Sequence, residues 1–357
     1  MTAFTFVDEP DTITPELHSH PLLGIDTEFM REKTFFAQLC LVQIATPDRV
    51  FCIDPLAGNP MRSFWDTTFS QTWVVHSARQ DIEVIFQTAG AMPAGLFDTQ
   101  IAAALLGMQP QIGYAGLVKE LFGAEIPKSH TRADWSQRPL PDELVHYAVE
   151  DVEYLLPAYE HLGERLEKAG RMEWAVQDSA MLLDESLYVF DETQAVQRLK
   201  GARNLRGRRR SAAERLTVWR EAEAARRDRP RQWILRDSVL LDIALELPGT
   251  MNALQSIDGL PAKLVKRAGG ELLAIVASSA EDSHDYQPPP APNEQQKRLL
   301  KSMQSTVAKR AEELGISPEL LAPRKELSAA ILSGRTDSRA FQGWRRDLIG
   351  EELLRLL

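Results

Sequence analysis

Five residues in this sequence have the types and the spacing to do chemistry together. Asp26 and Glu28 lie in LLGIDTEFM, Asp81 lies in SARQDIEVI, and Tyr147 and Asp151 lie in HYAVEDVEYLL. Each is next to an apolar stretch that should be buried, so the fold must place acidic groups at the edge of a hydrophobic core. Buried carboxylates are tolerated when a cation neutralises them. Because the candidate ligand atoms are all oxygens, Mg²⁺ or Mn²⁺ fits better than Zn²⁺, and two such ions about 4 Å apart are a common device for phosphodiester cleavage.

A predicted strand positions the first acidic pair. Asp26 and Glu28 are two residues apart, so their side chains leave the same face of the strand. The other positions of LLGIDTEF are mostly apolar, which makes two acids on one face unusual. The alternative is an edge strand whose outer face is solvated.

Predicted helices position the other three residues. Tyr147 and Asp151 are four apart and therefore face the same way, although a tyrosine at this spacing alone usually packs in a core. Asp81 follows a strand that ends at Ser77, and Ser77 with Gln80 resembles a capping box that would place Asp81 in the first turn of a helix. The helix dipole alone also favours an aspartate there. The combination of acids and a phenol around one sheet is what indicates a site.

Strand-like and helix-like stretches alternate in the first half of the chain. Short apolar segments rich in β-branched residues predict strands at 22–29, 36–46, 49–56 and 72–77. The first three are too close in sequence for crossover helices and should form an antiparallel meander. Helical patterns follow at 78–90, 97–107, 114–123 and 141–169, and Pro157 should kink or interrupt the last one. The sequence therefore predicts a mixed sheet with helices on its faces.

After Arg171 the pattern predicts helices and no further strand. The stretch HDYQPPPAPNEQQ favours extended geometry and separates two helical modules. We predict an α/β domain over 1–190, a helical domain over 205–284, a proline-rich linker over 285–296 and a second helical domain over 297–357. A weak echo between AGGELLAIV and LIGEELLRLL relates the ends of the two helical modules.

The composition is that of a globular protein, with 357 residues of which 44% are hydrophobic. The sequence has no apolar run of about 18 residues and no signal-peptide layout at its start, so we expect a cytoplasmic, water-soluble protein without a membrane partner. Cys40 and Cys52 lie in strand-like runs. Buried free thiols are the expected state, with a disulfide as the alternative.

Charge is distributed unevenly along the chain. The net charge is −10, yet the segment from Arg198 to Arg236 holds fourteen Arg or Lys against four Asp or Glu, a local charge of +10. The remainder therefore carries −20. A basic segment joined to an acidic, metal-binding half indicates a polyanionic partner. The alternative is a solvated helix face, but NLRGRRRS contains a basic cluster with no acidic partner in it.

The motifs DTEF, HSARQD and YAVED, in this order, resemble those of the DEDD superfamily of 3′–5′ exonucleases. FFAQLCLVQIAT and RADWSQRPLP are similar to the ribonuclease D family within it. RLTVWREAEAARRDRPRQWILRDSVLLDIA resembles an HRDC domain, a helical nucleic-acid-binding module, and GWRRDLIGEELL resembles a second, divergent copy. The resemblance covers nearly the whole chain. It implies a ribonuclease H-like α/β nuclease domain followed by two all-α HRDC-like domains.

The DEDD superfamily has a tyrosine and a histidine subtype, and HYAVED fits both patterns. On an ideal helix Tyr147 is about 40° from Asp151, whereas His146 is about 140° away. The histidine pattern requires the helix to begin after His146. Because Pro141 indicates an earlier start, we expect the tyrosine subtype, with His146 as a surface or supporting residue.

The resemblance also implies an activity. It is the hydrolysis of the 3′-terminal phosphodiester of tRNA precursors and other small structured RNAs, which releases nucleoside 5′-monophosphates. Two divalent ions, Mg²⁺ or Mn²⁺, would be held by Asp26, Glu28, Asp81 and Asp151, and Tyr147 would orient the attacking water. RNA is the expected partner, and we expect a monomer. The alternatives are a related exonuclease that acts on DNA and a non-catalytic RNA-binding scaffold.

Further residues are candidates for contacts with RNA. The resemblance places Thr27 and Phe29 near the terminal sugar and base, with ordinary strand packing as the alternative for Phe29. Other side chains are expected to line the cleft, to stack on a base or to bind phosphate, with core packing as the alternative for the tryptophan. These are His76, Gln80, Arg132, Trp135 and Arg138.

Overall fold

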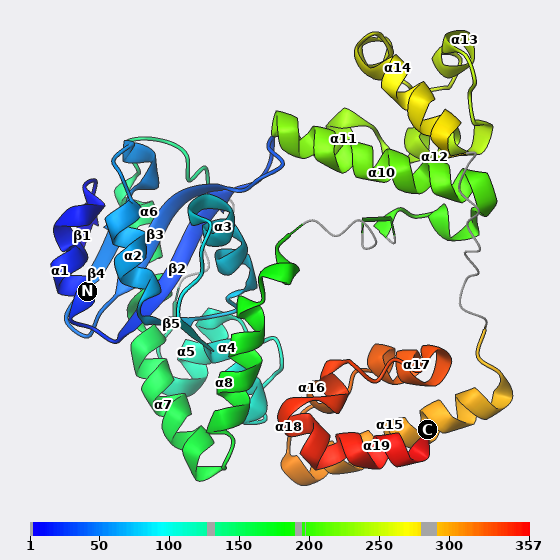
Figure 1. Ribbon diagram of the computed structural model, residues 1–357. Helices are drawn as coiled ribbons and strands as arrows, with labels where there is room; N and C mark the ends of the chain where they lie inside the picture. Colours follow the sequence, from blue (N-terminus) through cyan, green and yellow to red (C-terminus); the bar gives the residue numbers. More distant parts are fainter. Residues whose placement is uncertain (1–2, 127–132, 190–194, 197, 280–290) are drawn as a thin grey trace. The chain divides into compact units, whose positions relative to one another are not determined.

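The computed structural model describes residues 3–126, 133–189, 195–196, 198–279 and 291–357, and the chain forms two compact units (Figure 1). The first unit consists of Met1–Met30, Gln38–Tyr188 and Ala291–Leu357. The second consists of Arg31–Ala37 and Val189–Pro290. Each unit has its own hydrophobic core.

Within the described residues, six strands of the first unit form one mixed sheet in the order β1-β4-β3-β2-β5-β6. The strands are β1 (Phe4–Val7), β2 (Leu22–Met30), β3 (Gln38–Ala45), β4 (Val50–Ile53), β5 (Thr72–Val75) and β6 (Gly95–Asp98). The meander prediction is confirmed, because β2–β3 and β3–β4 pair antiparallel. Strand β5 runs parallel to both β2 and β6, and β1 is parallel to β4. Strands β1 and β6 were not predicted: β1 lies outside the predicted segments, and the last two residues of β6 were assigned to the helical pattern at 97–107.

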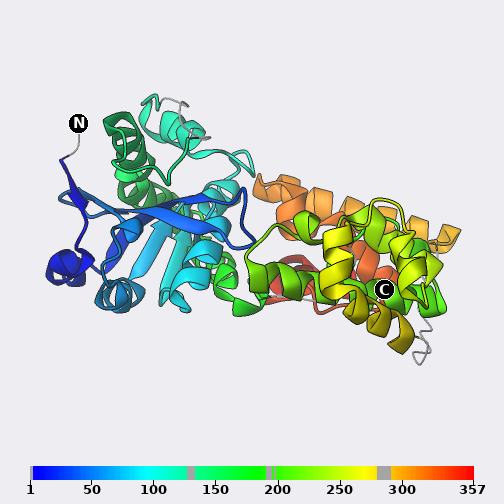
Figure 2. The same cartoon turned by 90° about the horizontal axis from the view of Figure 1, so that it is seen from above.

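Helices cover both faces of this sheet, as Figure 2 shows from above. Helices α6 (Asp142–Glu153) and α7 (Leu155–Lys168) pack on one face, and α3 (Arg79–Ala89) contacts β2 and β3 from the other. The remaining helices of the α/β part that are used below are α4 (Thr99–Leu105), α5 (Tyr114–Phe122) and α8 (Met172–Ala180). At Gly24 the sheet and α7 approach closely, because a Cβ there would lie 3.1 Å from the Leu155 Cβ.

The long helical segment predicted over 141–169 is interrupted, as expected, between α6 and α7. The break lies at Tyr154, and Pro157 is the third residue of α7. A proline in the first turn is tolerated because the N–H groups there have no partner within the helix. The Tyr154 N–H at the break donates instead to the Tyr114 hydroxyl at 3.0 Å.

The C-terminal helices belong to the first unit rather than forming a separate compact body. They are α15 (Glu294–Leu314), α16 (Pro318–Leu321), α17 (Arg324–Ser333), α18 (Gly343–Arg345) and α19 (Glu351–Leu356). Their apolar side chains join those of the α/β part in one hydrophobic core, in which Leu162 and Met303 are both fully buried. Helix α15 begins at Glu294, so residues 294–296, which were predicted to be linker, are helical. Asn293 and Gln296 form a capping box at this start.

A buried ion pair, the α8–α18 contact, joins these helices to the α/β part. The Asp178 carboxylate accepts two hydrogen bonds from the Arg345 guanidinium, both 2.6 Å long. It accepts a third, of 3.0 Å, from the indole nitrogen of Trp344. Trp344 stacks on Trp174 with the ring centroids 4.3 Å apart. Because both charges are almost completely buried, each depends on this pairing.

The second unit is helical in its described residues. Helices α10 (Gly207–Arg227), α12 (Asp237–Glu246) and α14 (Ala262–Ser278) surround a core that includes Leu216, Leu240 and Leu272. The short helices α11 (Arg231–Ile234) and α13 (Met251–Gln255) connect them. No strand occurs after Arg171 in the parts of the chain that are described, as the sequence predicted.

Cys40 and Cys52 are both buried free thiols, so the expected state is confirmed. Burial raises the pKa of the Cys40 thiol to about 11 and that of Cys52 to about 12. Among the described residues, no helix has the length and apolar character to cross a membrane.

Candidate active site

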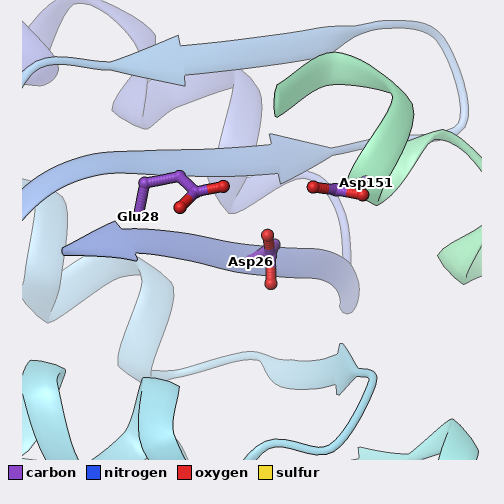
Figure 3. Close-up of side chains that lie close together, drawn as sticks. All are labelled: Asp26, Glu28 and Asp151. Carbon is purple, nitrogen blue, oxygen red and sulfur yellow. The ribbon is translucent and has the colours of Figure 1, made fainter. Parts of the chain in front are cut away.

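Three of the predicted acidic residues converge on one face of the sheet. Asp26 and Glu28 leave the same side of β2, and Asp151 reaches them from α6 (Figure 3). One carboxylate oxygen of each lies within 4.8 Å of those of the other two. Two residues on a strand and one on a helix packed against it therefore supply three convergent oxygen donors.

Asp81 approaches Asp26 from the first turn of α3, as predicted, but not through the predicted capping box. Ser77 has a positive φ of 62°, and the side chain of Gln80 does not cap the helix. Instead, the Asp98 carboxylate accepts hydrogen bonds from the N–H groups of Ser77 at 3.1 Å and Ala78 at 2.9 Å. A capping box presumes ordinary extended geometry at the cap residue, and the left-handed backbone of Ser77 rules this out.

Asp98 was not singled out in the sequence. It lies at the end of β6, and it also accepts from the N–H groups of Gln100 at 2.8 Å and Ile101 at 3.3 Å at the start of α4. One carboxylate thus holds the starts of two helices, including the helix that carries Asp81. The signal was present in FDTQI, where an aspartate precedes a helical pattern.

A hydrogen bond from the neighbouring strand residue Thr27 holds the Asp81 side chain. The Thr27 hydroxyl donates to the Asp81 carboxylate at 2.5 Å, and Thr27 is buried. Asp81 is not one of the three residues whose donors converge, but its charge raises the pKa of Asp26. It therefore lies close enough to act with them electrostatically.

The acidic residues hold their protons unusually strongly. Burial, followed by the charges of Asp81, Asp151 and Glu28, raises the pKa of Asp26 well above its ordinary value. Burial and the charges of Asp151 and Asp81 raise the pKa of Glu28 to about 9. Burial raises the pKa of Asp81 and Asp151 to about 7, opposed by hydrogen bonds from Thr27 and Tyr147 respectively. Four acids with this behaviour at one place need a cation to be ionised together.

This donor set fits hard divalent cations. All of the ligand atoms are carboxylate oxygens, three of which converge, and the nearest cysteines are protonated and buried in β3 and β4. Such oxygen sites bind Mg²⁺ or Mn²⁺ in preference to softer metals. Bound ions would also offset the repulsion that raises the pKa values of the acids.

Tyr147, rather than His146, faces the acids. Helix α6 begins at Asp142, so both residues are helical and one turn separates Tyr147 from Asp151. The Tyr147 hydroxyl hydrogen-bonds to the Asp151 carboxylate, and burial together with nearby negative charge raises its pKa far above the ordinary value. His146 is exposed; its Nδ1 lies 2.6 Å from the Asp142 carbonyl oxygen, and its ring lies 5.5 Å from that of Phe4.

Two of the residues predicted to contact RNA make contacts within the protein. Arg138 was expected to bind phosphate, but its guanidinium binds the Asp54 carboxylate with two bonds of 2.6 Å. It also donates to the Cys40 carbonyl at 2.7 Å. Trp135 is only 3% exposed and packs near Tyr147, with ring centroids 6.1 Å apart. The partner of Arg138 lies 84 residues away, so local sequence could not reveal it.

Of the other residues predicted to contact RNA, His76 is already hydrogen-bonded within the protein, and Phe29 and Gln80 are accessible. Both ring nitrogens of His76 are engaged, Nδ1 with the Thr99 hydroxyl and Nε2 with the Ile112 carbonyl, each at 2.9 Å. Phe29 is half-buried and Gln80 is exposed, so both remain accessible. Arg132 lies outside the described residues.

Tyr114 is a site neighbour that the sequence did not indicate. Its hydroxyl accepts from the Tyr154 N–H at the break between α6 and α7, and its ring meets that of His76 at 5.6 Å. Burial raises the pKa of Tyr114, and the charges of Asp151 and Asp26 contribute. It thereby fixes the end of the helix that carries Asp151.

Comparison with known proteins identifies the family. A 3′–5′ exonuclease family model matches residues 2–167, and an HRDC domain model matches residues 209–276. The chain is 36% identical to ribonuclease D of Gluconacetobacter diazotrophicus, with 99% of this chain and 91% of that protein covered. It is 35% identical to ribonuclease D of Pseudomonas paraeruginosa, with 96% and 93% covered. The chain belongs to the ribonuclease D family.

Solved structures agree with this family. The crystal structure of Escherichia coli RNase D, an exoribonuclease involved in structured RNA processing, matches with a TM-score of 0.89 at 28% identity and covers 99% of this chain and 98% of that one. The catalytic core of RRP6 from Trypanosoma brucei matches with a TM-score of 0.59 at 26% identity and covers 78% and 80%.

Membership of the ribonuclease D family confirms several of the sequence predictions. The predicted α/β nuclease fold with flanking helices and a following helical HRDC domain is confirmed. The chain is a 3′–5′ exonuclease and therefore a hydrolase. A second HRDC-like domain over 297–357, the domain boundaries and the tyrosine subtype stay predictions.

Proposed function

We propose that this member of the ribonuclease D family is an exoribonuclease that shortens structured RNAs, including tRNA precursors, one nucleotide at a time from the 3′ end. The observation that carries the proposal is the convergence of Asp26, Glu28 and Asp151 inside a 3′–5′ exonuclease domain. Full-length similarity to ribonuclease D proteins supports RNA as the substrate. We propose a monomer in the cytoplasm.

Two divalent ions, Mg²⁺ or Mn²⁺, are the proposed cofactors. Asp26, Glu28 and Asp151 would hold one ion directly, and Asp26 with Asp81 would hold the other, the latter through water. Divalent ions in such a site supply an activated water and offset the charge that develops at the scissile phosphate. Thr27, which donates to Asp81, fixes the orientation of that carboxylate.

Tyr147 is the proposed residue that orients the attacking water. Its pKa is raised far above the ordinary value, so the phenol stays neutral at physiological pH and does not act as a general base. A neutral hydroxyl can accept a hydrogen bond from one group while it donates to another. Its bond to Asp151 holds it beside the position where the substrate phosphate must lie, and we therefore assign the chain to the tyrosine subtype.

The second unit is the proposed docking site for the body of the RNA. Part of its positive charge is structural, since Arg210 pairs with Glu214 and Arg220 pairs with Asp237. The side chains of Arg209, Arg229 and Arg236 are exposed, and these three residues form what we term the outer arginine set. Exposed guanidinium groups attract phosphates by a salt-dependent, sequence-independent interaction.

An exposed aromatic residue is close in sequence to two members of the outer arginine set. Trp233 on α11 is 61% exposed, and Arg229 and Arg236 lie within four residues of it. Exposed aromatic rings provide stacking surfaces for unpaired bases. This combination supports the assignment of the second unit to RNA binding.

Product analysis tests the proposed function. A 3′-extended tRNA is incubated with the enzyme and Mg²⁺, and the products are resolved by length and by chromatography of nucleotides. We expect a ladder shortened from the 3′ end together with nucleoside 5′-monophosphates, and neither with Asp26→Asn. Retained activity in Asp26→Asn, or cleavage inside the chain, would contradict the proposal.

A further inference from the structure

A buried glutamine beside the acidic site has no partner. Gln43 on β3 is 0% exposed, and neither its amide nitrogen nor its amide oxygen has a hydrogen-bond partner among the described residues. Buried amides in folded proteins are almost always paired. An unpaired one destabilises the fold that contains it, so this side chain needs an explanation beyond packing.

The sheet register places Gln43 next to Asp26. The two residues are directly opposite each other in the antiparallel pair β2–β3. Directly opposite residues project from the same face, with their Cβ atoms about 5 Å apart. Gln43 therefore extends from the face that carries Asp26 and that α6, the helix of Asp151, covers.

The other neighbours of Gln43 on this face cannot satisfy an amide. Cys52 is directly opposite on β4, and its protonated thiol is a weak hydrogen-bonding group. Leu41 and Ala45, two positions away on β3, are apolar and buried. Among the neighbouring positions of the sheet, the strong acceptors on this face are therefore the carboxylates of β2, of which Asp26 is directly opposite Gln43.

We propose that Gln43 is a positioning residue of the metal site, whose amide nitrogen donates to a carboxylate oxygen of Asp26 when the site holds divalent ions. The amide would fix the orientation of this carboxylate and stabilise its negative charge. Residues behind metal ligands commonly act in this way. The inference rests on the proposed metal site, and it assigns to Gln43 no contact with the RNA.

Binding of Mn²⁺ by the full-length protein tests the inference, measured by the electron paramagnetic resonance of free Mn²⁺ in the absence of RNA. Gln43→Met keeps the length of the side chain and removes the amide, and Gln43→Leu is a second apolar variant. We expect the Mn²⁺ affinity of both variants to be weaker than that of the wild type by about 10-fold or more. Ile44→Val is the matched control, because Ile44 is equally buried, is adjacent on β3 and faces the other side of the sheet. Its Mn²⁺ affinity should equal that of the wild type.

Thermal unfolding of the metal-free proteins supplies the second readout. Removal of an unpaired buried amide should leave the melting temperature of Gln43→Met unchanged or higher, while Mn²⁺ affinity falls. Unchanged Mn²⁺ affinity in both apolar variants, with or without a lower melting temperature, would overturn the role of Gln43 and leave the metal site intact. Absence of Mn²⁺ binding by the wild type would instead overturn the proposed metal site itself.

Discussion

At the scale of single residues, the acidic site is distinguished by the raised pKa values of its carboxyl groups. The pKa of Glu28 is raised to about 9, and the pKa values of Asp81 and Asp151 are raised to about 7. Ordinary carboxyl groups titrate near pH 4. At neutral pH the metal-free site is therefore partly protonated, and ions must compete with protons for the same oxygens.

The first prediction concerns the pH dependence of stability. Near pH 4 and below, the acids are protonated in both folded and unfolded chains. As the pH rises, the unfolded chain releases these protons first, because the folded-state pKa values are raised, so the metal-free fold loses stability between about pH 4 and 9. Thermal unfolding in a chelator should show a melting temperature that falls over this range, and Glu28→Gln should reduce the fall above pH 7.

The pH prediction has a direct control. Saturating Mn²⁺ should remove most of the decline and should bind more tightly as the pH rises, with release of protons on binding. A melting temperature of the metal-free protein that rises steadily from pH 5 to 9 would contradict the protonation account.

The second prediction separates Tyr147 from His146. Tyr147→Phe removes the hydroxyl that bonds to Asp151, and we expect kcat to fall about 100-fold with little change in KM, since the loss concerns the reacting water. His146→Ala should retain kcat within about twofold, because that side chain is exposed and bound to its own helix. The opposite result would assign the chain to the histidine subtype.

At the scale of elements, the loop before α6 supports the catalytic tyrosine. Trp135 packs near Tyr147, and the Arg138–Asp54 pair ties this loop to the end of β4. The third prediction follows from that pair. Arg138→Met should lower the free energy of unfolding by about 2 kcal/mol, because it leaves the buried Asp54 carboxylate without its charged donor. Urea denaturation measures this loss.

The same variant distinguishes a structural arginine from a phosphate-binding one. RNA affinity at fixed salt should be unchanged in Arg138→Met below its unfolding transition. Wild-type stability combined with weaker RNA binding and a smaller salt dependence would mean that Arg138 binds phosphate after all.

Much of the element pattern could be predicted, and the errors have physical causes. The strands of the meander were recognisable because they are apolar and closely spaced, and the helix break because Pro157 lacks an N–H. Strand β6 was missed because its residues Phe97 and Asp98 run directly into the helical pattern that continues as α4. The start of α3 depends on Asp98 from another strand, which a local capping rule cannot include.

At the scale of the whole molecule, the C-terminal helices share the core of the α/β part. Local sequence patterns could not reveal this, because Asp178 and its partner Arg345 lie 167 residues apart. A truncation after residue 190 would therefore remove part of the first unit's core as well as the second unit. Hydrolysis of short oligonucleotides by such a fragment would test folding rather than RNA binding.

The fourth prediction tests the α8–α18 contact. Arg345→Met leaves the Asp178 carboxylate buried and without its charged partner, which should lower the free energy of unfolding by about 3–5 kcal/mol. Adding Asp178→Leu should recover much of this loss, since a buried ion pair can often be replaced by apolar side chains. Chemical denaturation measures both values, and an additive loss in the double variant would contradict the pairing.

The fifth prediction concerns the outer arginine set. Replacing Arg209, Arg229 and Arg236 together by glutamate should weaken binding of a structured RNA and reduce the slope of log affinity against log salt. Hydrolysis of a short oligonucleotide should be unchanged, because these residues belong to the second unit and the acidic site to the first. Equal losses on long and short substrates would contradict this division of roles.

The prediction of the site from sequence succeeded where spacing within one element decides the geometry. The two-residue spacing of Asp26 and Glu28 and the four-residue spacing of Tyr147 and Asp151 sufficed to place each pair on one face. Contacts between elements, such as that of Arg138 with Asp54, required the fold. Gln43 stood out only when the sheet register placed it opposite Asp26.

If distant carboxylates together bind divalent cations, a crystal soaked in Mn²⁺ should show the ions in place. We expect anomalous density between the carboxylate oxygens of Asp26, Glu28 and Asp151, and a second peak on the Asp81 side of Asp26. Clear density for these side chains with no anomalous peak among them would contradict it.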